Sequence, residues 1–185
     1  MSQALATRAQ LKAGLFRKLL VTVPAVVLIG GAAGRLANSG NDNAWFAELV
    51  KPVWMPPSWA FGVVWTCLYI MLGCALAIIW NARGARGRGV AVALFAVQFA
   101  LNVAWSPVFF ALHQITAAFG LILAMIAAAF VTFLAFGRVR RSAAYLMLPY
   151  LAWLCFAAAL NYDYMRLNPD AQTLVPGGRT NQISA

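Results

Sequence analysis

The run GVAVALFAVQFALNVAWSPVFFALHQITAAFGLILAMIAAAFVTFLAFG, residues 89–137, decides the fold because it contains no Asp, Glu, Lys or Arg. A membrane-spanning helix needs roughly 20 apolar residues to cross about 30 Å of hydrocarbon, and this run is too long for one such helix. The segment SPVFFALHQIT, residues 106–116, places a proline and several polar side chains near its middle. The run therefore predicts two membrane spans, near 90–112 and 117–136, with a polar break between them.

Composition and the remaining charges extend this pattern to the whole chain. The sequence is 63% hydrophobic and 10% charged, which is typical of a membrane protein rather than of a soluble domain. Charged residues delimit three further apolar runs, near 19–34, 59–80 and 143–162. None of the runs shows the alternation of a transmembrane barrel. Since backbone in lipid must be hydrogen-bonded internally, we expect an all-α membrane protein, a bundle of five transmembrane helices.

The charge distribution tests this number of spans and predicts their orientation. Five alternating spans place ten cations on one side: Arg8, Lys12, Arg17, Lys18, Arg83, Arg86, Arg88, Arg138, Arg140 and Arg141. The other side receives four cations and all four acids, and so has no net charge: Arg35, Lys51, Arg166, Arg179, Asp42, Glu48, Asp163 and Asp170. The positive-inside rule then predicts a multi-pass membrane protein with the N-terminus cytoplasmic and the C-terminus outside. For a bacterial host, we expect it in the cell membrane. Because the cations lie in short connections beside spans, we expect no nucleic-acid partner.

The limits of the predicted spans divide the chain into three parts. We expect a basic cytoplasmic tail at 1–18, a five-helix membrane domain at 19–166 and a flexible tail at 167–185. The first span also has features of a secretory signal peptide: a basic start, a short apolar stretch and small residues. Its basic region is long and Arg35 follows directly, so a retained helix is the favoured interpretation. Gly30 and Gly34 then predict a face that packs closely on another helix.

Several chemistries are missing from the predicted spans. The second to fifth spans contain no Asp, Glu, Lys or Arg, which argues against an ion-coupled transporter. The cysteines Cys67, Cys74 and Cys155 have no CxxC spacing, so we expect buried thiols and no metal site. His113 has no partner motif, and a turn residue is a better interpretation than a heme ligand.

What the spans do hold is a set of neutral polar residues among aromatic ones. The polar residues are Gln98, Asn102, Ser106, Asn161 and Thr66, and the aromatic residues are Trp65, Trp105, Trp153, Phe109 and Tyr150. Apolar walls with a few amide and indole donors are typical of a pocket for a large, flat ligand. Amides also hydrogen-bond between helices in any membrane bundle, and the sequence leaves both interpretations open.

The segment WFAELVKPVWMPPSWAFGVVWTCLY, residues 45–69, combines tryptophans with prolines just before the second span. Such a composition suits either an aromatic belt at the membrane interface or a rigid aromatic lid over a cavity. Together with ALNVAWSPVFFALHQ and LPYLAWLCFAAALNYDYMRLN, it resembles the translocator protein family, also called the TspO/MBR, tryptophan-rich sensory protein or peripheral-type benzodiazepine receptor family. The resemblance extends from about Val23 to Asn168.

The resemblance implies five transmembrane helices with a Trp/Pro-rich loop between the first two that covers a ligand cavity. It also implies ligands of the porphyrin, heme-precursor, cholesterol and synthetic isoquinoline or benzodiazepine classes. Phe46 stands where the family often has tyrosine, and Ala117 stands where some animal members have a ligand-lining tryptophan. The predicted ligand-binding residues are Trp45, Phe46, Trp54, Pro56, Phe61, Trp65, Asn102, Trp105, Trp153, Ala157 and Leu160.

Two further features predict partners. Leu160, Tyr162 and Arg166 fit a proposed cholesterol pattern, although Tyr162 and Arg166 at a helix end are more often plain interfacial anchors. The ladder of Ala96, Ala100 and Ala104 has the small-residue spacing that lets helices approach closely, and it predicts a homodimer.

We therefore expect a membrane receptor or sensor that binds tetrapyrroles, with porphyrin or heme as ligand and no required cofactor, and that also accepts sterol-like lipids. The alternative that the resemblance suggests is light- and oxygen-dependent porphyrin degradation, with Trp65 as the candidate catalytic residue. A third interpretation is a structural or regulatory partner protein with a vestigial pocket. The sequence does not separate these functions, because the first two need the same pocket.

Overall fold

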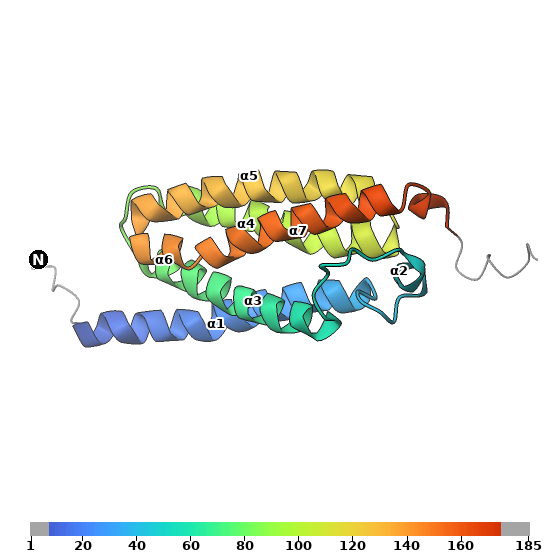
Figure 1. The fold of residues 1–185 in the computed structure, drawn as a ribbon. Helices are drawn as coiled ribbons and strands as arrows, with labels where there is room; N and C mark the ends of the chain where they lie inside the picture. The colour runs from blue at the N-terminus through green and yellow to red at the C-terminus, as the bar shows by residue number, and fades with distance from the viewer. Residues whose placement is uncertain (1–7, 175–185) are drawn as a thin grey trace, which may run out of the picture.

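The computed structural model describes residues 8–174, and this part of the chain is helical with no strand (Figure 1). The helices are α1 (Arg8–Leu36), α2 (Ala44–Glu48), α3 (Ser58–Asn81), α4 (Arg88–Ser106), η1 (Pro107–Ala111), α5 (Ile115–Val139), α6 (Arg141–Tyr145), α7 (Leu148–Leu167) and η2 (Ala171–Thr173). Five helical segments of the described residues are long and apolar enough to cross a membrane. The predicted all-α bundle of five spans is therefore confirmed.

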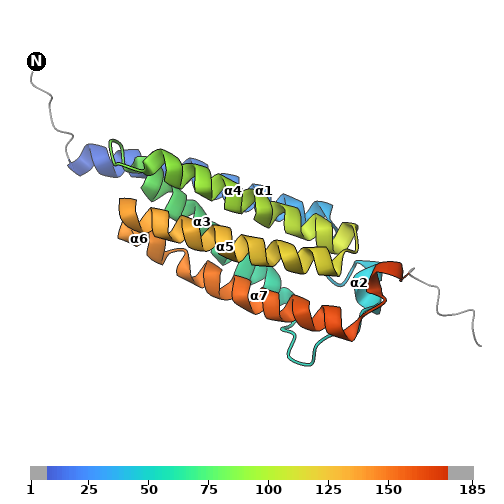
Figure 2. The ribbon, with the colours of Figure 1, turned by 90° about the horizontal axis from the view of Figure 1, so that it is seen from above.

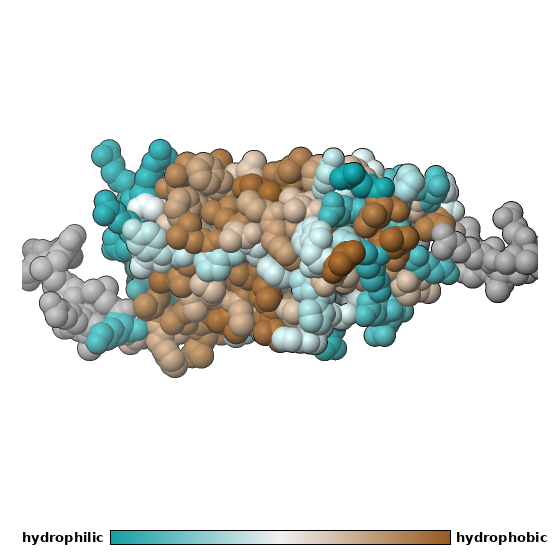
Figure 3. Space-filling model, in the orientation of Figure 1, coloured by the Kyte–Doolittle hydropathy of each residue, from teal (hydrophilic) through white to brown (hydrophobic). Residues whose placement is uncertain are grey.

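The bundle has two layers that run along the same axis. α1 lies along α3 in one layer, and α5 packs between α4 and α7 in the other (Figures 1 and 2). The turn between α3 and α4 and the junction of α5 with α6 lie at one end, while α2 and the end of α7 lie at the other. Hydrophobic residues cover the middle of the molecule and hydrophilic residues gather toward its ends (Figure 3).

Two helix boundaries differ from the predicted ones, and each lies beside a proline. The predicted polar break begins near Pro107, but the helix continues through this proline as the wider turn η1, in which the Leu112 amide donates to the Pro107 carbonyl. The chain reverses only after it, where His113 has φ 57°, so His113 is a turn residue as predicted. The fifth span is interrupted after α6, because Pro149 has no N–H to donate to the helix.

Close contact between α1 and α3 makes α1 an integral part of the bundle. A Cβ on Gly30 would overlap the Tyr69 ring, and one on Gly73 would lie 2.7 Å from the Val23 Cα. The Thr22 Oγ1 donates to the Gly73 carbonyl at 2.8 Å. The packing role predicted for Gly30 is confirmed, whereas Gly34 has only Ser39 near it at 3.9 Å.

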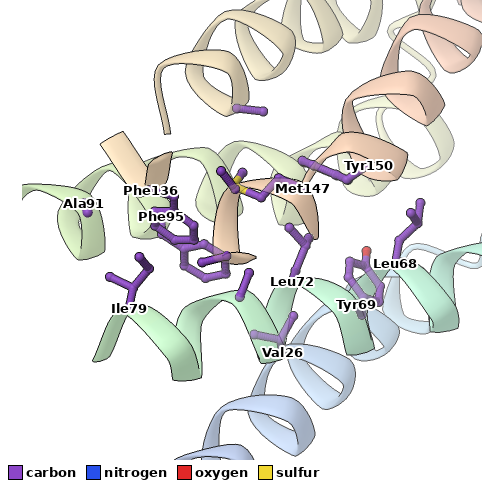
Figure 4. Packing of buried hydrophobic residues seen from close by; sticks show 14 of the residues in the cluster. Val26, Leu68, Tyr69, Leu72, Ile79, Ala91, Phe95, Phe136, Met147 and Tyr150 are labelled. Carbon is purple, nitrogen blue, oxygen red and sulfur yellow. The ribbon is translucent and has the colours of Figure 1, made fainter. Parts of the chain in front are cut away.

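A hydrophobic core fills the space between the two layers. Leu72 and Ile79 of α3 meet Phe95 of α4, Phe136 of α5 and Met147, which precedes α7 (Figure 4). The prediction of buried thiols is wrong: Cys67 and Cys155 are exposed and Cys74 is half-buried. A cysteine inside an apolar span can face lipid as easily as the core, since its thiol is only weakly polar.

Both predicted tails contain ordered structure. α1 begins at Arg8, so part of the basic segment 1–18 belongs to a helix that extends beyond the apolar run. Within the predicted C-terminal tail, residues 167–174 contain η2, and Ala171 is only 2% exposed because it packs against the loop that joins α1 to α3. The remaining tail residues, 1–7 and 175–185, lie outside the described residues.

Candidate ligand cavity

The helices and the α1–α3 loop enclose a cavity of about 580 Å³ at the end of the bundle where α2 lies. α1, α3, α4, η1, α5 and α7 all contribute side chains to it, as does the loop at residues 37–57, called the covering loop below. Most lining residues are apolar or aromatic, and the few polar ones are nearly all neutral. A cavity of this size and character is typical of a small-molecule site.

A hydrogen-bonded network forms one border of the cavity. The Tyr69 hydroxyl of α3 donates to the Asn102 Oδ1 of α4 at 3.0 Å, and the Asn102 Nδ2 donates to the Tyr150 Oη of α7 at 3.2 Å. All three side chains are buried, with Tyr150 0% exposed. Asn102 therefore joins three helices, the helix-packing role that the sequence left open, and it also faces the cavity.

Three tryptophans form the aromatic walls. The Trp65 ring of α3 lies 6.4 Å from the Trp153 ring of α7, and the Trp105 ring of α4 stacks on Phe109 at 5.1 Å. The indole N–H groups of Trp105 and Trp153 are buried and have no hydrogen-bond partner among the described residues. Both residues line the cavity, while their N–H groups themselves are buried away from its open space.

Asn161 of α7 adds a third unpartnered group to the lining. Its Nδ2 donates to the Ile115 carbonyl at 3.0 Å, while its buried Oδ1 accepts no hydrogen bond within residues 8–174. The amide is thus held in one orientation by the backbone of α5, with its oxygen left for another donor. Asn161 and the two indoles thus leave three buried polar atoms without a partner on cavity-lining residues that the structure describes.

The covering loop is built around the short helix α2. Asn43 caps this helix, because its Oδ1 accepts from the Phe46 amide at 3.0 Å while its Nδ2 donates to the Phe110 carbonyl at 3.1 Å. Phe46 consequently faces the cavity. Trp45 points elsewhere: its indole donates to the Ala171 carbonyl at 2.8 Å, and its ring stacks on His113 at 4.4 Å.

Side chains near the end of α7 hold the covering loop in place. The Val50 amide donates to the Asn168 Oδ1 at 2.8 Å, and the Asn168 Nδ2 donates to the Val50 carbonyl at 2.9 Å. The Trp54 indole donates to the Asp163 Oδ2, also at 2.8 Å. The loop therefore covers the end of the cavity as a fixed element, tied to the last transmembrane helix.

The structure separates the predicted ligand-binding residues into two groups. Those that line the cavity are Phe46, Phe61, Trp65, Asn102, Trp105, Trp153, Ala157 and Leu160. Trp45, Trp54 and Pro56 do not line it. Trp45 and Trp54 instead use their indole N–H groups to fix the covering loop.

The residues of the proposed sterol pattern do not share a face. Leu160 is 6% exposed and lines the cavity, whereas Tyr162 is 44% exposed. Arg166 lies over the Tyr162 ring, with its Cζ 5.9 Å from the ring centroid, and is exposed. This arrangement fits the alternative interpretation of Tyr162 and Arg166 as interfacial anchors.

Sequence reasoning missed several lining residues that helical spacing could have revealed. Tyr69 lies one turn beyond Trp65, which itself lies one turn beyond Phe61, so the three share one face of α3. Tyr164 follows Leu160 on α7 in the same way. His113 does not line the cavity, and the described residues contain no group of three His, Cys, Asp or Glu that could hold a metal ion.

Comparison with known proteins places these features in a family context. The sequence model of the TspO/MBR family matches residues 21–167. The chain is 39% identical over 140 residues to tryptophan-rich protein TspO of Chlorobaculum tepidum, covering 75% of this chain and 89% of that protein. It is 41% identical over 135 residues to the translocator protein of Ovis aries, covering 72% and 80%. It is 35% identical over 140 residues to the tryptophan-rich sensory protein of Cereibacter sphaeroides, covering 74% and 87%.

The network at Asn102 predicts an order of stabilities. Asn102→Ala leaves both tyrosine hydroxyls without their partner, and we expect a loss of about 1–3 kcal/mol in the free energy of unfolding. Tyr150→Phe removes one hydrogen bond and should cost about 0.5–1.5 kcal/mol. Reversible unfolding in mixed detergent micelles measures both. Tyr145→Phe, which alters an exposed ring, is the control, and equal stability of the Asn102 and Tyr145 variants would refute the role of the network.

Proposed function

Because this chain belongs to the TspO/MBR family and is a multi-pass membrane protein, we propose that its cavity binds a tetrapyrrole, such as a porphyrin or heme precursor, for sensing or trafficking. The observation that carries this proposal is the aromatic lining of the cavity, to which Trp65, Trp105 and Trp153 all contribute. Such walls suit a large, flat aromatic ligand.

The aromatic lining supports a flat ligand. The rings of Trp65, Trp153 and Phe61 lie within 6.4 Å of one another in neighbouring pairs, and the planes in each pair are steeply inclined. A flat macrocycle that stacks on one of these rings meets the edge of another, and both geometries are favourable for aromatic pairs. The small side chain of Ala157 leaves room on the α7 wall. Sterol-like lipids are a second class of ligand for the same apolar cavity.

The position of Trp65 also fits the alternative function, degradation of a bound porphyrin. Its easily oxidised indole lines the cavity and contacts Tyr69 at 5.3 Å between ring centroids. A bound porphyrin would lie beside this ring whether it is carried or broken down. The two functions differ in whether the macrocycle survives illumination in the presence of oxygen.

Titration with protoporphyrin, first in darkness and then under light, tests the proposal. We expect saturable binding in darkness and an intact ligand afterwards. Trp65→Phe removes an N–H group and part of the stacking surface, and should weaken binding roughly tenfold, which corresponds to about 1.4 kcal/mol. Absorbance of the porphyrin measures both binding and ligand loss.

Trp80→Phe is the matched control, because Trp80 is exposed at the opposite end of α3 and does not line the cavity. It should leave binding unchanged. Protein-dependent bleaching that disappears in the Trp65 variant would instead support degradation. Absence of saturable binding in the unaltered protein would refute the proposed function.

We further propose that the end of the bundle with the α3–α4 turn faces the cytoplasm, because the positive-inside rule predicts this orientation from the cluster of cations near that end. In cells carrying a variant without native cysteines, a membrane-impermeant thiol reagent should label Asp42→Cys in the covering loop. It should not label Gly89→Cys at the start of α4. Both replaced residues are exposed. The reverse labelling pattern would show the opposite orientation.

We also propose a homodimer through α4. Ala96 and Ala100 are exposed on this helix and Ala104 is half-buried, so the ladder is largely free for a second chain. Ala100→Leu should therefore shift the protein toward monomer, as measured by the mass of the protein in detergent. Ala152→Leu, at an exposed position on α7, is the control. An Ala100 variant that stays as dimeric as the unaltered protein would place the interface elsewhere.

A further inference from the structure

We propose that the ligand of this cavity carries an anionic group, and that Arg35 binds this group at the mouth of the cavity. The inference rests on the proposed function, since it concerns the chemistry of the same ligand. It adds a polar end to a ligand whose body is apolar, and so defines the ligand class as an amphiphilic anion.

Arg35 is the one charged residue among the cavity-lining residues that the structure describes. All other polar lining groups are hydroxyls, amides and indoles. A single guanidinium in such surroundings carries a full positive charge and planar donors that suit a carboxylate. A neutral ligand would give this group only uncharged acceptors, which form weaker hydrogen bonds than a carboxylate does.

The Arg35 side chain is available for a ligand. It is exposed, and no hydrogen bond or ion pair engages it within residues 8–174. The other cation near the covering loop, Lys51, is already engaged: its Nζ donates to the Asn41 Oδ1 at 3.2 Å and lies 5.2 Å from the Phe46 ring centroid. Lys51 does not line the cavity.

Arg35 also borders the place where the cavity opens. Gly31 of α1 and Gly62 of α3 line the cavity, are exposed, and have no atom within 4 Å of where a Cβ would lie. A residue that both lines a cavity and is exposed marks its opening, and such residues lie on α1, on α3 and at the start of the covering loop, where these three elements meet. Arg35 follows Gly31 by one helical turn, toward the end of α1.

This placement matches the needs of an amphiphilic anion in a membrane. The apolar body can pass between the glycines of α1 and α3, while the anionic group stays at the end of the bundle, near the polar boundary of the membrane. A charged group carried further into the cavity would lose its hydration without finding a cation. Arg35 therefore fixes which end of the ligand enters last.

The test compares protoporphyrin, which has two carboxylates, with its uncharged dimethyl ester, in a neutral detergent. The unaltered protein should bind the free acid about three- to tenfold more tightly than the ester, a range set by an exposed but charge-assisted contact. Arg35→Gln should bring the ratio to about one without weakening ester binding, and Arg35→Lys should restore part of it. Higher salt should reduce the ratio in the unaltered protein.

Arg166→Gln is the matched control, because it removes a cation from the same end of the bundle at a position that does not line the cavity. It should keep the preference for the free acid. Equal binding of acid and ester by the unaltered protein, or an unchanged ratio in Arg35→Gln, would overturn this inference and leave the proposed function standing. Binding of neither porphyrin would overturn both.

Discussion

The amide of Asn102, held between the hydroxyls of Tyr69 and Tyr150, is the interaction on which the rest of the structure depends. Lipid offers these groups no hydrogen-bond partner, so within the bundle they pair with one another. The two hydrogen bonds of Asn102 fix α3, α4 and α7 relative to each other. Gly30 then brings α1 against the Tyr69 ring from the other side, which extends the same contact to a fourth helix. The cavity is the space left on one side of this junction.

The aromatic residues of the tryptophan- and proline-rich segment, residues 45–69, have two different roles. Trp45 and Trp54 donate to the Ala171 carbonyl and to Asp163, and so attach the covering loop to the end of α7. Phe46 and Trp65 face the cavity instead. Trp59 is 71% exposed at the start of α3, and Trp80 is 44% exposed at its end, where aromatic belts lie in membrane proteins. Within residues 45–69, the belt interpretation therefore applies to Trp59, and the lid interpretation to Trp45 and Trp54.

The number of spans could be predicted because charge and length constrain it strongly: a charge-free run as long as residues 89–137 must cross twice. The direction of individual side chains could not, since it depends on helix packing. Trp45 and Phe46 are adjacent in sequence, yet only the fold shows that one binds Ala171 and the other faces the cavity. The two tyrosine partners of Asn102 could not be predicted from the sequence either. An amide in a membrane span indicates that a hydrogen bond forms, but not which residue it forms with.

The most direct test of the account is ligand protection of a cysteine that lines the cavity. Ala157 lines it, whereas Cys155, two residues earlier on α7, is exposed on the outside of the bundle. In a variant with Cys67 and Cys74 replaced, the rate of reaction with N-ethylmaleimide is measured at Ala157→Cys and at native Cys155, with and without protoporphyrin. The account predicts slower labelling at position 157 and an unchanged rate at Cys155. An equal effect at both positions, or none at position 157, would contradict it.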